Sequence, residues 1–469
     1  MHTQEASETG RRGAGTASSQ AVGGDVPLVD PARRLGDASA AALALAPEVG
    51  RAWQQVRERV VAESLMQVAQ PGEERRPFPV LPMLAALHPE AEPELRRRVT
   101  GVVGCLEQLV RRYPADAELQ DFLAVPPLLH RWIMEEPGER ELTIDYCRLD
   151  LLGSDLGDVR VLEFNPSSPG GVISSGMLNR FWRESSLGPV LADWAAPPAP
   201  FERHDWFARW LLEYGRERGV PDNGHPIGLY HASKSTRFEL DQVQRQLSGC
   251  GREAVLMRPC EVGRADGVRL GYFKFIPIEL DEVPQWDRFC ARLVEGAIVV
   301  PNRLGARWVA ENKLCLAALS DPRFRRLFHG SDAAHLDTLV PYSRKLGDGV
   351  DEAEVIRRRE ELVLKAPYSF HGKDVHIGGE HDQRSWERVV SAPGHQGWLV
   401  QERLRAGVLN AGDGTPYLHD LVVPVLGGRV IGYSSRANTG PLLNGAQGGG
   451  AYALFSPHPL DDAAQSGGG

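Results

Sequence analysis

The chain has 469 residues, of which 42% are hydrophobic and 25% charged, a composition typical of a globular protein. The formal net charge of -9, from 53 basic and 62 acidic residues, argues against a general nucleic-acid binder. The length predicts roughly two to four domains, and no apolar run reaches the roughly 18 residues typical of a membrane span.

Both ends of the chain are polar. Residues 1–25 lack the apolar core of a secretory signal, so we expect a disordered tail and a cytoplasmic protein. Residues 459–469 predict a second disordered tail. The six cysteines show no C-x-x-C pair and no zinc-like Cys/His spacing, which indicates reduced and buried thiols.

The first half of the chain changes its periodicity near residue 141. Residues 26–140 carry helical spacing, as in ELRRRVTGVVGCLEQLVRRY, and predict a helical N-terminal region that packs on the rest. ELTIDYCRLDLL and VRVLEFN, separated by GSDLGD, predict a β-hairpin. With the helix of residues 204–218, this hairpin defines a region at 141–225.

Strands and helices alternate over residues 226–302, which predicts a small α/β layer with a parallel sheet but without a glycine-rich dinucleotide fingerprint. Residues 303–458 begin with a helix, ARWVAENKLCLAALSD, and continue mainly as strands. These include a hairpin with a Gly-Gly turn in LHDLVVPVLGGRVIGYSSRA.

The hairpin near residue 150 gathers oxygen-bearing side chains. If its turn centres on residues 155–158, Asp150 lies opposite Glu163 and Arg148 lies opposite Asn165, all on one face. Carboxylates directly opposite each other destabilise a hairpin, and a divalent cation between them reverses that effect. Hard oxygen ligands favour magnesium over zinc. A solvated hairpin face is the alternative, and both stay open on these residues alone.

A second candidate is VLKAPYSFHGKDV. Lys365 ends an apolar run, where a lysine is costly to bury without an anion. The loop that follows holds Ser369, His371, Gly372 and Lys373, whose N–H groups and charge suit a phosphate. A surface hairpin with an extended lysine explains the same residues.

Weaker signals lie in three other segments. Lys313 falls inside the predicted helix that begins residues 303–458. In WLVQERL, an apolar strand leads into Gln401 and Glu402, where exposed strand backbone would contact adenine. Towards the C-terminus, Arg436 and Asn438 end a strand, and the glycine-rich NGAQGGG that follows suits a loop closing on a ligand.

The order of these segments resembles the ATP-grasp superfamily. Because LEFNPSSPGG precedes both lysines by more than a hundred residues, the order is similar to the circularly permuted branch that includes the synthetase domain of glutathionylspermidine synthase. CRLDLL, LEFNPSSPGG, VPNRLGARWVAENKLCLAAL, VLKAPYSFHGKDV and WLVQERL carry the resemblance, which covers roughly residues 140–455. It implies an α+β ATP-grasp fold, in which residues 226–302 form a pre-ATP-grasp layer.

The resemblance also implies roles for individual residues. The expected metal ligands are Asp150, Glu163 and Asn165, and the expected catalytic residues are Arg148 and Arg436. The expected nucleotide-binding residues are Lys313, Lys365, Ser369, Gly372, Lys373, Gln401, Glu402 and Leu404. The expected substrate-binding residues are Ser167, Ser168 and Asn438. His371 has no counterpart in the family pattern.

The implied function is an ATP-dependent ligase that joins a small-molecule carboxylate to an amine through an acyl phosphate, with ATP and Mg²⁺ as cofactors. A small-molecule kinase and a non-catalytic nucleotide-binding module are the alternatives on the same fold. We expect neither a nucleic-acid nor a membrane partner, and a homodimer is the common prior for the oligomeric state.

Overall fold

The computed structural model describes residues 47–63, 67–68, 76–136, 143–232, 234–262, 267–275, 286–369, 374–410, 415–440, 443 and 449–460. The predictions for the tail at 1–25, for most of the tail at 459–469 and for most of NGAQGGG lie outside these ranges. So do those for His371, Gly372 and Lys373.

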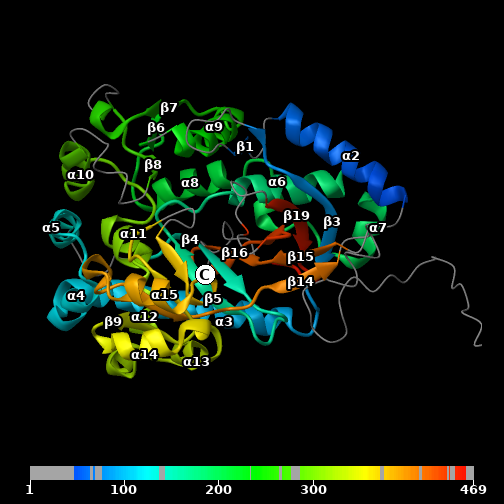
Figure 1. Ribbon diagram of the computed structural model, residues 1–469. Coiled ribbons are helices and arrows are strands. Elements are labelled where there is room, and N and C mark those ends of the chain that lie inside the picture. The colour runs from blue at the N-terminus through cyan, green and yellow to red at the C-terminus, as the bar shows by residue number, and fades with distance from the viewer. Residues whose placement is uncertain are drawn as a thin grey trace, which may run out of the picture.

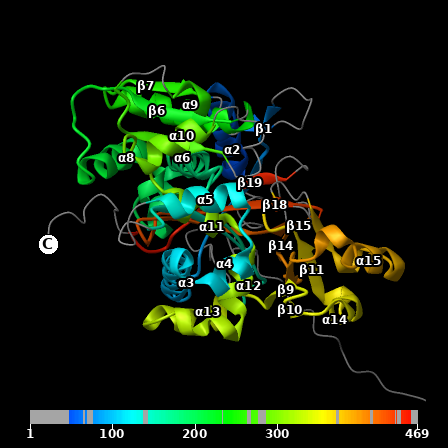
Figure 2. The ribbon, with the colours of Figure 1, turned by 90° about the vertical axis from the view of Figure 1, so that its left-hand side faces the viewer.

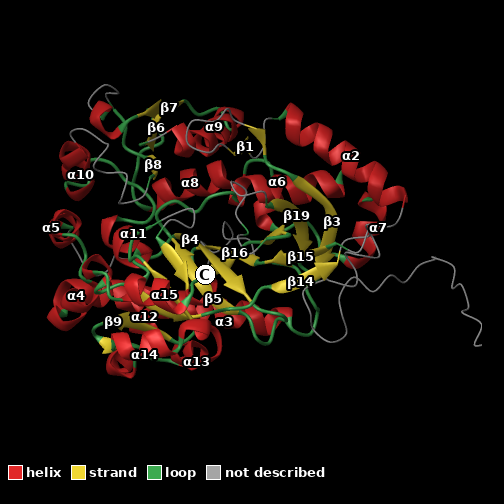
Figure 3. Ribbon diagram, viewed as in Figure 1, coloured by secondary structure: helices red, strands yellow, loops and turns green. Residues whose placement is uncertain are grey.

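The described helices are α2 (Pro47–Ala62), α3 (Glu92–Arg112), α4 (Ala117–Leu123), α5 (Pro127–Glu135), α6 (Val172–Arg183), α7 (Gly188–Trp194), α8 (Trp206–Glu217), α9 (Lys234–Gly249), α10 (Trp286–Val294), α11 (Leu304–Glu311), α12 (Leu314–Ser320), α13 (Leu336–Leu339), α14 (Glu352–Arg357) and α15 (Gln383–Val390). Most of them surround the strands on the outside of the molecule (Figure 3). Among these helices we find none with the length and apolarity that a membrane crossing requires.

The described strands are β1 (Gln67–Val68), β2 (Arg76–Pro77), β3 (Val80–Ala86), β4 (Tyr146–Leu152), β5 (Arg160–Asn165), β6 (Ile227–His231), β7 (Ala254–Met257), β8 (Gly271–Lys274), β9 (Ser343–Leu346), β10 (Gly349–Val350), β11 (Leu362–Lys365), β12 (Val375–Ile377), β13 (Leu399–Glu402), β14 (Gly407–Asn410), β15 (Pro416–His419), β16 (Leu421–Leu426), β17 (Arg429–Val430), β18 (Tyr433–Asn438) and β19 (Gly450–Phe455).

Three sheets organise the fold. The central sheet runs β14-β15-β18-β16-β4-β5, with β19 and β3 joined through β18. A five-stranded sheet, in the order β10-β9-β13-β11-β12, lies with α14 and α15 at the lower right of Figure 2. The three-stranded parallel sheet β7-β6-β8 lies at the top of Figure 1 with α9. The fold is thus mixed α/β, and the strands β6, β7 and β8, which come from residues 226–302, pair in parallel as their alternation with helices predicts.

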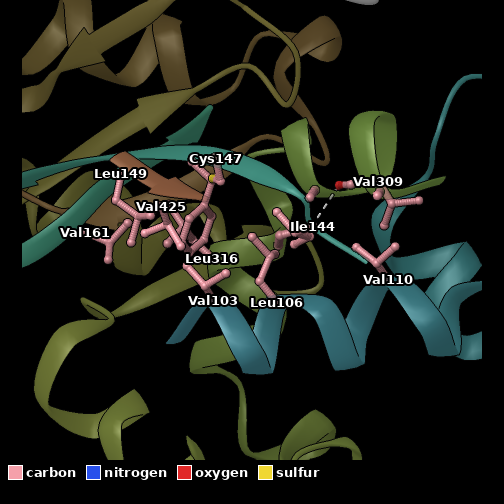
Figure 4. Close-up of a cluster of buried hydrophobic side chains, with 14 of the residues drawn as sticks. Val103, Leu106, Val110, Ile144, Cys147, Leu149, Val161, Val309, Leu316 and Val425 are labelled. Carbon is pink, nitrogen blue, oxygen red and sulfur yellow. Dashed lines mark hydrogen bonds between the residues drawn. The ribbon is translucent and has the colours of Figure 1, made fainter. Parts of the chain in front are cut away.

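The main core joins α3 to the hairpin of β4 and β5. Val103, Leu106 and Val110 follow helical spacing, so they share one face of α3 and are buried. In Figure 4, Val103 and Leu106 lie below the strand residues Cys147 and Leu149, which alternate with polar residues along β4, and Val110 lies beside Val309. This packing determines which face of the hairpin lies against α3. The polar side chains therefore lie on the opposite face.

Three differences from the sequence expectations concern local structure. Residues 80–86, which fall in the region expected to be helical, form β3 and pair in parallel with β19. The strand expected at AIVVPN is reduced to a single bridge between Leu270 and Val299. The helix expected to continue through ARWVAENKLCLAALSD is broken between α11 and α12, where Asn312 has extended backbone angles (φ -64°, ψ 117°).

Candidate active site

The hairpin places its polar face as the sequence predicts. Asp150 pairs with Glu163 and Arg148 pairs with Asn165, so the predicted register is confirmed. The register then shifts, because Leu151 pairs with Val161. This shift is a β-bulge, which leaves a strand residue outside the regular ladder.

The bulge gives Lys365 a partner. Leu162, the residue that the bulge leaves over, offers its carbonyl oxygen to the amino group of Lys365 at 3.2 Å. The same Nζ donates to the Oε1 of Gln401 at 2.6 Å. Lys365 ends β11, and its side chain is only 4% exposed. The five-stranded sheet and the hairpin of the central sheet therefore meet at this lysine.

Lys313 reaches the same place through the break between α11 and α12. Its backbone N–H donates to Pro367 O at 2.9 Å, and its Nζ donates to Ser369 O at 2.8 Å. The amino group also lies 3.6 Å from the Oε2 of Glu163. If the helix continued through residue 313, the backbone N–H of Lys313 would donate to a carbonyl oxygen of the helix and not to Pro367.

The surroundings of Lys365 shift the pKa of its amino group. Burial, together with the positive charge of Lys313, lowers its pKa to about 8, although the negative charge of Glu163 acts in the opposite direction. A cation held in protein at this cost is suited to an anion that replaces the lost water. The cluster of Glu163, Lys313 and Lys365 is called the lysine cluster below.

A row of four charges lies beside the lysine cluster. Arg148 donates from Nε and Nη2 to the two oxygens of Asp150, at 2.7 and 2.9 Å. Arg436 donates from Nη2 to Asp150 at 2.7 Å and from Nε to Asp420 at 2.8 Å. Both carboxylates are 1% exposed. The positive and negative charges of the row balance, and the row connects β4 and β18 to the residue between β15 and β16.

The two carboxyl groups in this row have opposite pKa shifts. Burial acts to raise the pKa of Asp150, but Arg148 and Arg436 outweigh it, so the pKa is lowered. For Asp420 burial dominates over Arg436, and the pKa is raised. The neighbouring arginines thus compensate the negative charge of Asp420 less well than that of Asp150.

Arg436→Met is expected to destabilise the folded protein by about 3–5 kcal/mol at pH 7, since it leaves buried carboxylates with less compensation. The loss should shrink as the pH falls, because these carboxylates then bind protons in the folded state. Urea unfolding at pH 5 and 7 measures both effects. A pH-independent loss would contradict this account.

Residues 166–171, called the 166–171 loop below, follow the hairpin. Ser167 is fully buried, its N–H donates to Glu311 at 2.9 Å, and its hydroxyl donates to Arg307 O at 3.0 Å. Both groups of Ser167 are thus engaged within the protein, whereas Ser168 is half-buried. Substrate contacts at Ser167, Ser168 and Asn438 stay a prediction. Asn438 ends β18, two residues beyond Arg436.

The adenine-binding prediction for WLVQERL needs one correction. β13 lies between β9 and β11, so its backbone pairs on both sides and offers no exposed edge. Gln401 is buried against Lys365 instead. Glu402 is the last residue of β13, and Leu404 follows in a loop. Adenine contacts at these residues stay a prediction.

Three charged residues near the site escaped the sequence interpretation. Glu311, at the end of α11, has its pKa raised to about 7 by burial, which Lys313 and the Ser167 N–H oppose. Lys274 and Glu239 form a buried ion pair beside the 166–171 loop. Lys274 ends the apolar GYFK strand, the same signal that identified Lys365.

The polar face of the hairpin is the candidate magnesium site. Within the described ranges, no three or more His, Cys, Asp and Glu side chains gather to hold a metal ion. The predicted set has two carboxylates and an amide, and the oxygens of Asp150 accept bonds from arginine. Glu163 is 28% exposed, and the buried Nδ2 of Asn165 has no partner among the described residues. An amide nitrogen does not ligate a metal, but the side-chain oxygens of Glu163 and Asn165, unlike those of Asp150, accept no bond from an arginine among the described residues, so these two residues fit a hard cation best.

The fold resembles that of a ligase-related protein. A solved structure of a glutathione synthetase-like effector from Globodera pallida, in its apo form, has a TM-score of 0.56 and 12% sequence identity, and the match covers 87% of this chain and 96% of that chain. At this identity the likeness shows the fold alone. The chain therefore has a mixed α/β fold of the glutathione synthetase-like kind.

A second structure is from Methylobacillus flagellatus KT and is provisionally named gamma-glutamylcysteine synthetase. It has a TM-score of 0.36 and 14% identity over 73% of this chain and 84% of that chain, which is too low to carry an argument. No protein-family model and no curated protein matches the sequence.

Proposed function

We propose that the chain is an ATP-dependent ligase that joins a carboxylate to an amine, on a circularly permuted ATP-grasp fold. The observation that carries the proposal is the lysine cluster. Lys313 and Lys365 come from separate segments and converge on Glu163, which lies some 150–200 residues earlier in the chain. The glutathione synthetase-like fold supports the same class of reaction.

The proposed roles follow from charge. Lys313 and Lys365 would neutralise phosphate oxygens of ATP, and Glu163 and Asn165 would hold Mg²⁺. When bound, the cation would reduce the charge on the phosphates. Arg148 and Arg436 would stabilise the transferring phosphoryl group, because their guanidinium groups are only 12% and 24% exposed and are held by carboxylates. Positioning and charge stabilisation dominate the catalysis of phosphoryl transfer.

The reaction proceeds in two balanced steps. A carboxylate oxygen of the substrate attacks the γ-phosphorus, and the bond from that phosphorus to the β–γ bridging oxygen breaks, releasing ADP. The amine then attacks the carbonyl carbon of the acyl phosphate, phosphate leaves, and the amine loses a proton. Phosphorylation is needed because a free carboxylate has no good leaving group.

A product screen tests this proposal. The full chain is incubated with MgATP and pairs of carboxylates and amines, and ADP and amide products are followed by mass spectrometry. An amide formed with one equivalent of ADP supports the ligase. A phosphorylated product that needs no amine would support the kinase alternative. Nucleotide binding without any turnover would leave only the binding module.

ATP affinity is expected to fall as the pH rises above about 8, because Lys365 is then neutral in the free protein and must take up a proton to bind phosphate. The dissociation constant should rise by up to about tenfold per pH unit. Calorimetry from pH 7 to 9.5, in buffers of different ionisation enthalpy, measures affinity and proton uptake together. A flat profile would exclude Lys365 as the titrating group.

A further inference from the structure

Charged side chains hold three consecutive residues of the 166–171 loop by their backbone. Lys274 donates to Pro169 O at 3.2 Å, and Arg148 donates from Nη1 to Gly170 O at 2.6 Å. The Gly171 N–H donates to the Oε2 of Glu239 at 3.2 Å. Arg148 belongs to the hairpin, whereas Lys274 and Glu239 come from β8 and α9 of the parallel α/β layer.

Lys274 and Glu239 are also bound to each other. Their amino and carboxylate groups form an ion pair, and the residues are 5% and 8% exposed. The same oxygen of Glu239 accepts from both Lys274 and the Gly171 N–H. A buried ion pair typically contributes little to stability, because desolvation of the two charges offsets their attraction. Stability alone therefore does not account for this pair.

The groups around Lys274 make its positive charge still more costly to bury. Burial lowers the pKa of Lys274, with Arg148 and Arg307 adding to the effect and Glu239 opposing it. Three cations and two carboxylates, those of Glu239 and Glu311, thus surround a short loop. Gly171 adopts a left-handed conformation (φ 77°), which turns the chain directly into α6. The loop is consequently fixed at both of its ends and in its middle.

We propose that Glu239 and Lys274 are positioning residues, which set the 166–171 loop so that Ser168 and Arg148 face the carboxylate substrate. The inference rests on the proposed function, and it deepens that function by giving the parallel α/β layer a role in substrate binding. Figure 1 shows this layer above α6, the helix that the loop enters, and α9 packs against α6.

The test removes both charges while keeping the side-chain volumes. Lys274→Met and Glu239→Gln are made singly and together in the full chain. Glutamine at position 239 keeps an oxygen that accepts from the Gly171 N–H. Methionine at position 274 has no donor for the carbonyl oxygen of Pro169. Each single change leaves one buried charge without its partner and should lower the melting temperature. The double variant should recover most of that loss.

The decisive readouts concern the loop. In the double variant, amide hydrogen exchange across residues 167–171 should be about tenfold faster, as expected for the loss of a hydrogen bond to a charged group. The KM for the carboxylate should rise about tenfold, while the KM for ATP stays unchanged. Arg183→Met with Glu202→Gln, another buried ion pair that does not contact the loop, is the matched control.

Two outcomes would overturn the inference. Unchanged loop exchange in the double variant would show that the pair does not fix the loop. Faster exchange with an unchanged KM for the carboxylate would show that the loop does not serve the substrate. If the unaltered chain forms no amide, the proposed ligase function fails, yet the exchange readout still tests whether the pair holds the loop.

Discussion

Glu163→Gln is expected to abolish ATP turnover while leaving the fold intact. Glutamine matches the carboxylate in shape, and the side chain is 28% exposed, so no buried cavity or strained contact results. The change removes the negative charge that faces Lys313 at 3.6 Å and, in the proposal, the principal oxygen ligand of Mg²⁺. Losing one such charged contact commonly costs a hundredfold or more in rate, about 3 kcal/mol.

The measurement is ADP release under saturating MgATP, with the melting temperature and circular dichroism as checks on folding. Asp158→Asn is the matched control, because it neutralises an exposed carboxylate in the turn of the same hairpin. The control should turn over ATP normally. Wild-type turnover in Glu163→Gln would remove this residue from the metal site.

Lys365→Met is expected to separate stability from function. The variant should raise the KM for ATP on the order of a hundredfold, as expected for the loss of a charged phosphate contact. Its folded state should be no less stable than that of the unaltered chain at pH 7. Burial lowers the pKa of Lys365 from 10.5 to about 8, and holding this charge therefore costs about 3 kcal/mol. Losing the bonds to Gln401 and Leu162 offsets part of that gain.

The sign of the stability difference should change with pH. The cost of the buried charge is fully present below pH 8, falls as the pH rises from 8 towards 10.5, and is lost above pH 10.5, where the lysine is neutral in both states. At pH 10 the variant should therefore be the less stable protein. Urea unfolding at pH 7 and 10 measures the change, and ADP release at varied ATP gives the KM.

Arg344→Met is the control for this prediction. Arg344 pairs with Val400 across the same sheet, so it faces away from the side on which Lys365 lies. Its KM for ATP should not change. A Lys365→Met variant that is markedly less stable at pH 7, or that binds ATP normally, would contradict the assigned environment of this lysine.

The sequence contained enough information for the local geometry of the hairpin. Alternation of apolar and polar residues in CRLDLL and LEFN, with a short turn between them, determines which side chains share a face. Asp150 and Glu163 could be paired for that reason. With the two faces exchanged, the polar residues of both strands would lie against α3 and be buried in the main core.

The break at Lys313 could not be predicted from periodicity. Apolar residues keep helical spacing through ARWVAENKLCLAALSD, so the pattern indicates one helix. The only local signal is Asn312, whose Oδ1 accepts from the Leu314 N–H and whose Nδ2 donates to Leu123 O. An asparagine that caps a helix is common, but its distant partner is a tertiary contact that a single sequence does not reveal.

Lys274 and Glu239 were missed in the sequence because their partners lie far away in the chain. Lys274 and Glu239 are 35 positions apart and hold a loop some 70–100 residues earlier, and neither fact has a periodic signature. Lys274 ends a buried strand much as Lys365 does. A lysine at the end of an apolar strand is therefore a useful general indicator of a buried anionic partner.

The bulge at Leu162 determines where the chain tolerates insertions and deletions. Lengthening the turn between β4 and β5 leaves all paired residues in place, because the added residues extend into solvent. Deleting a residue at the bulge restores a regular ladder and withdraws the carbonyl that accepts from Lys365. When distant homologues are aligned with this chain, gaps therefore belong in residues 153–158 and not between Val161 and Glu163.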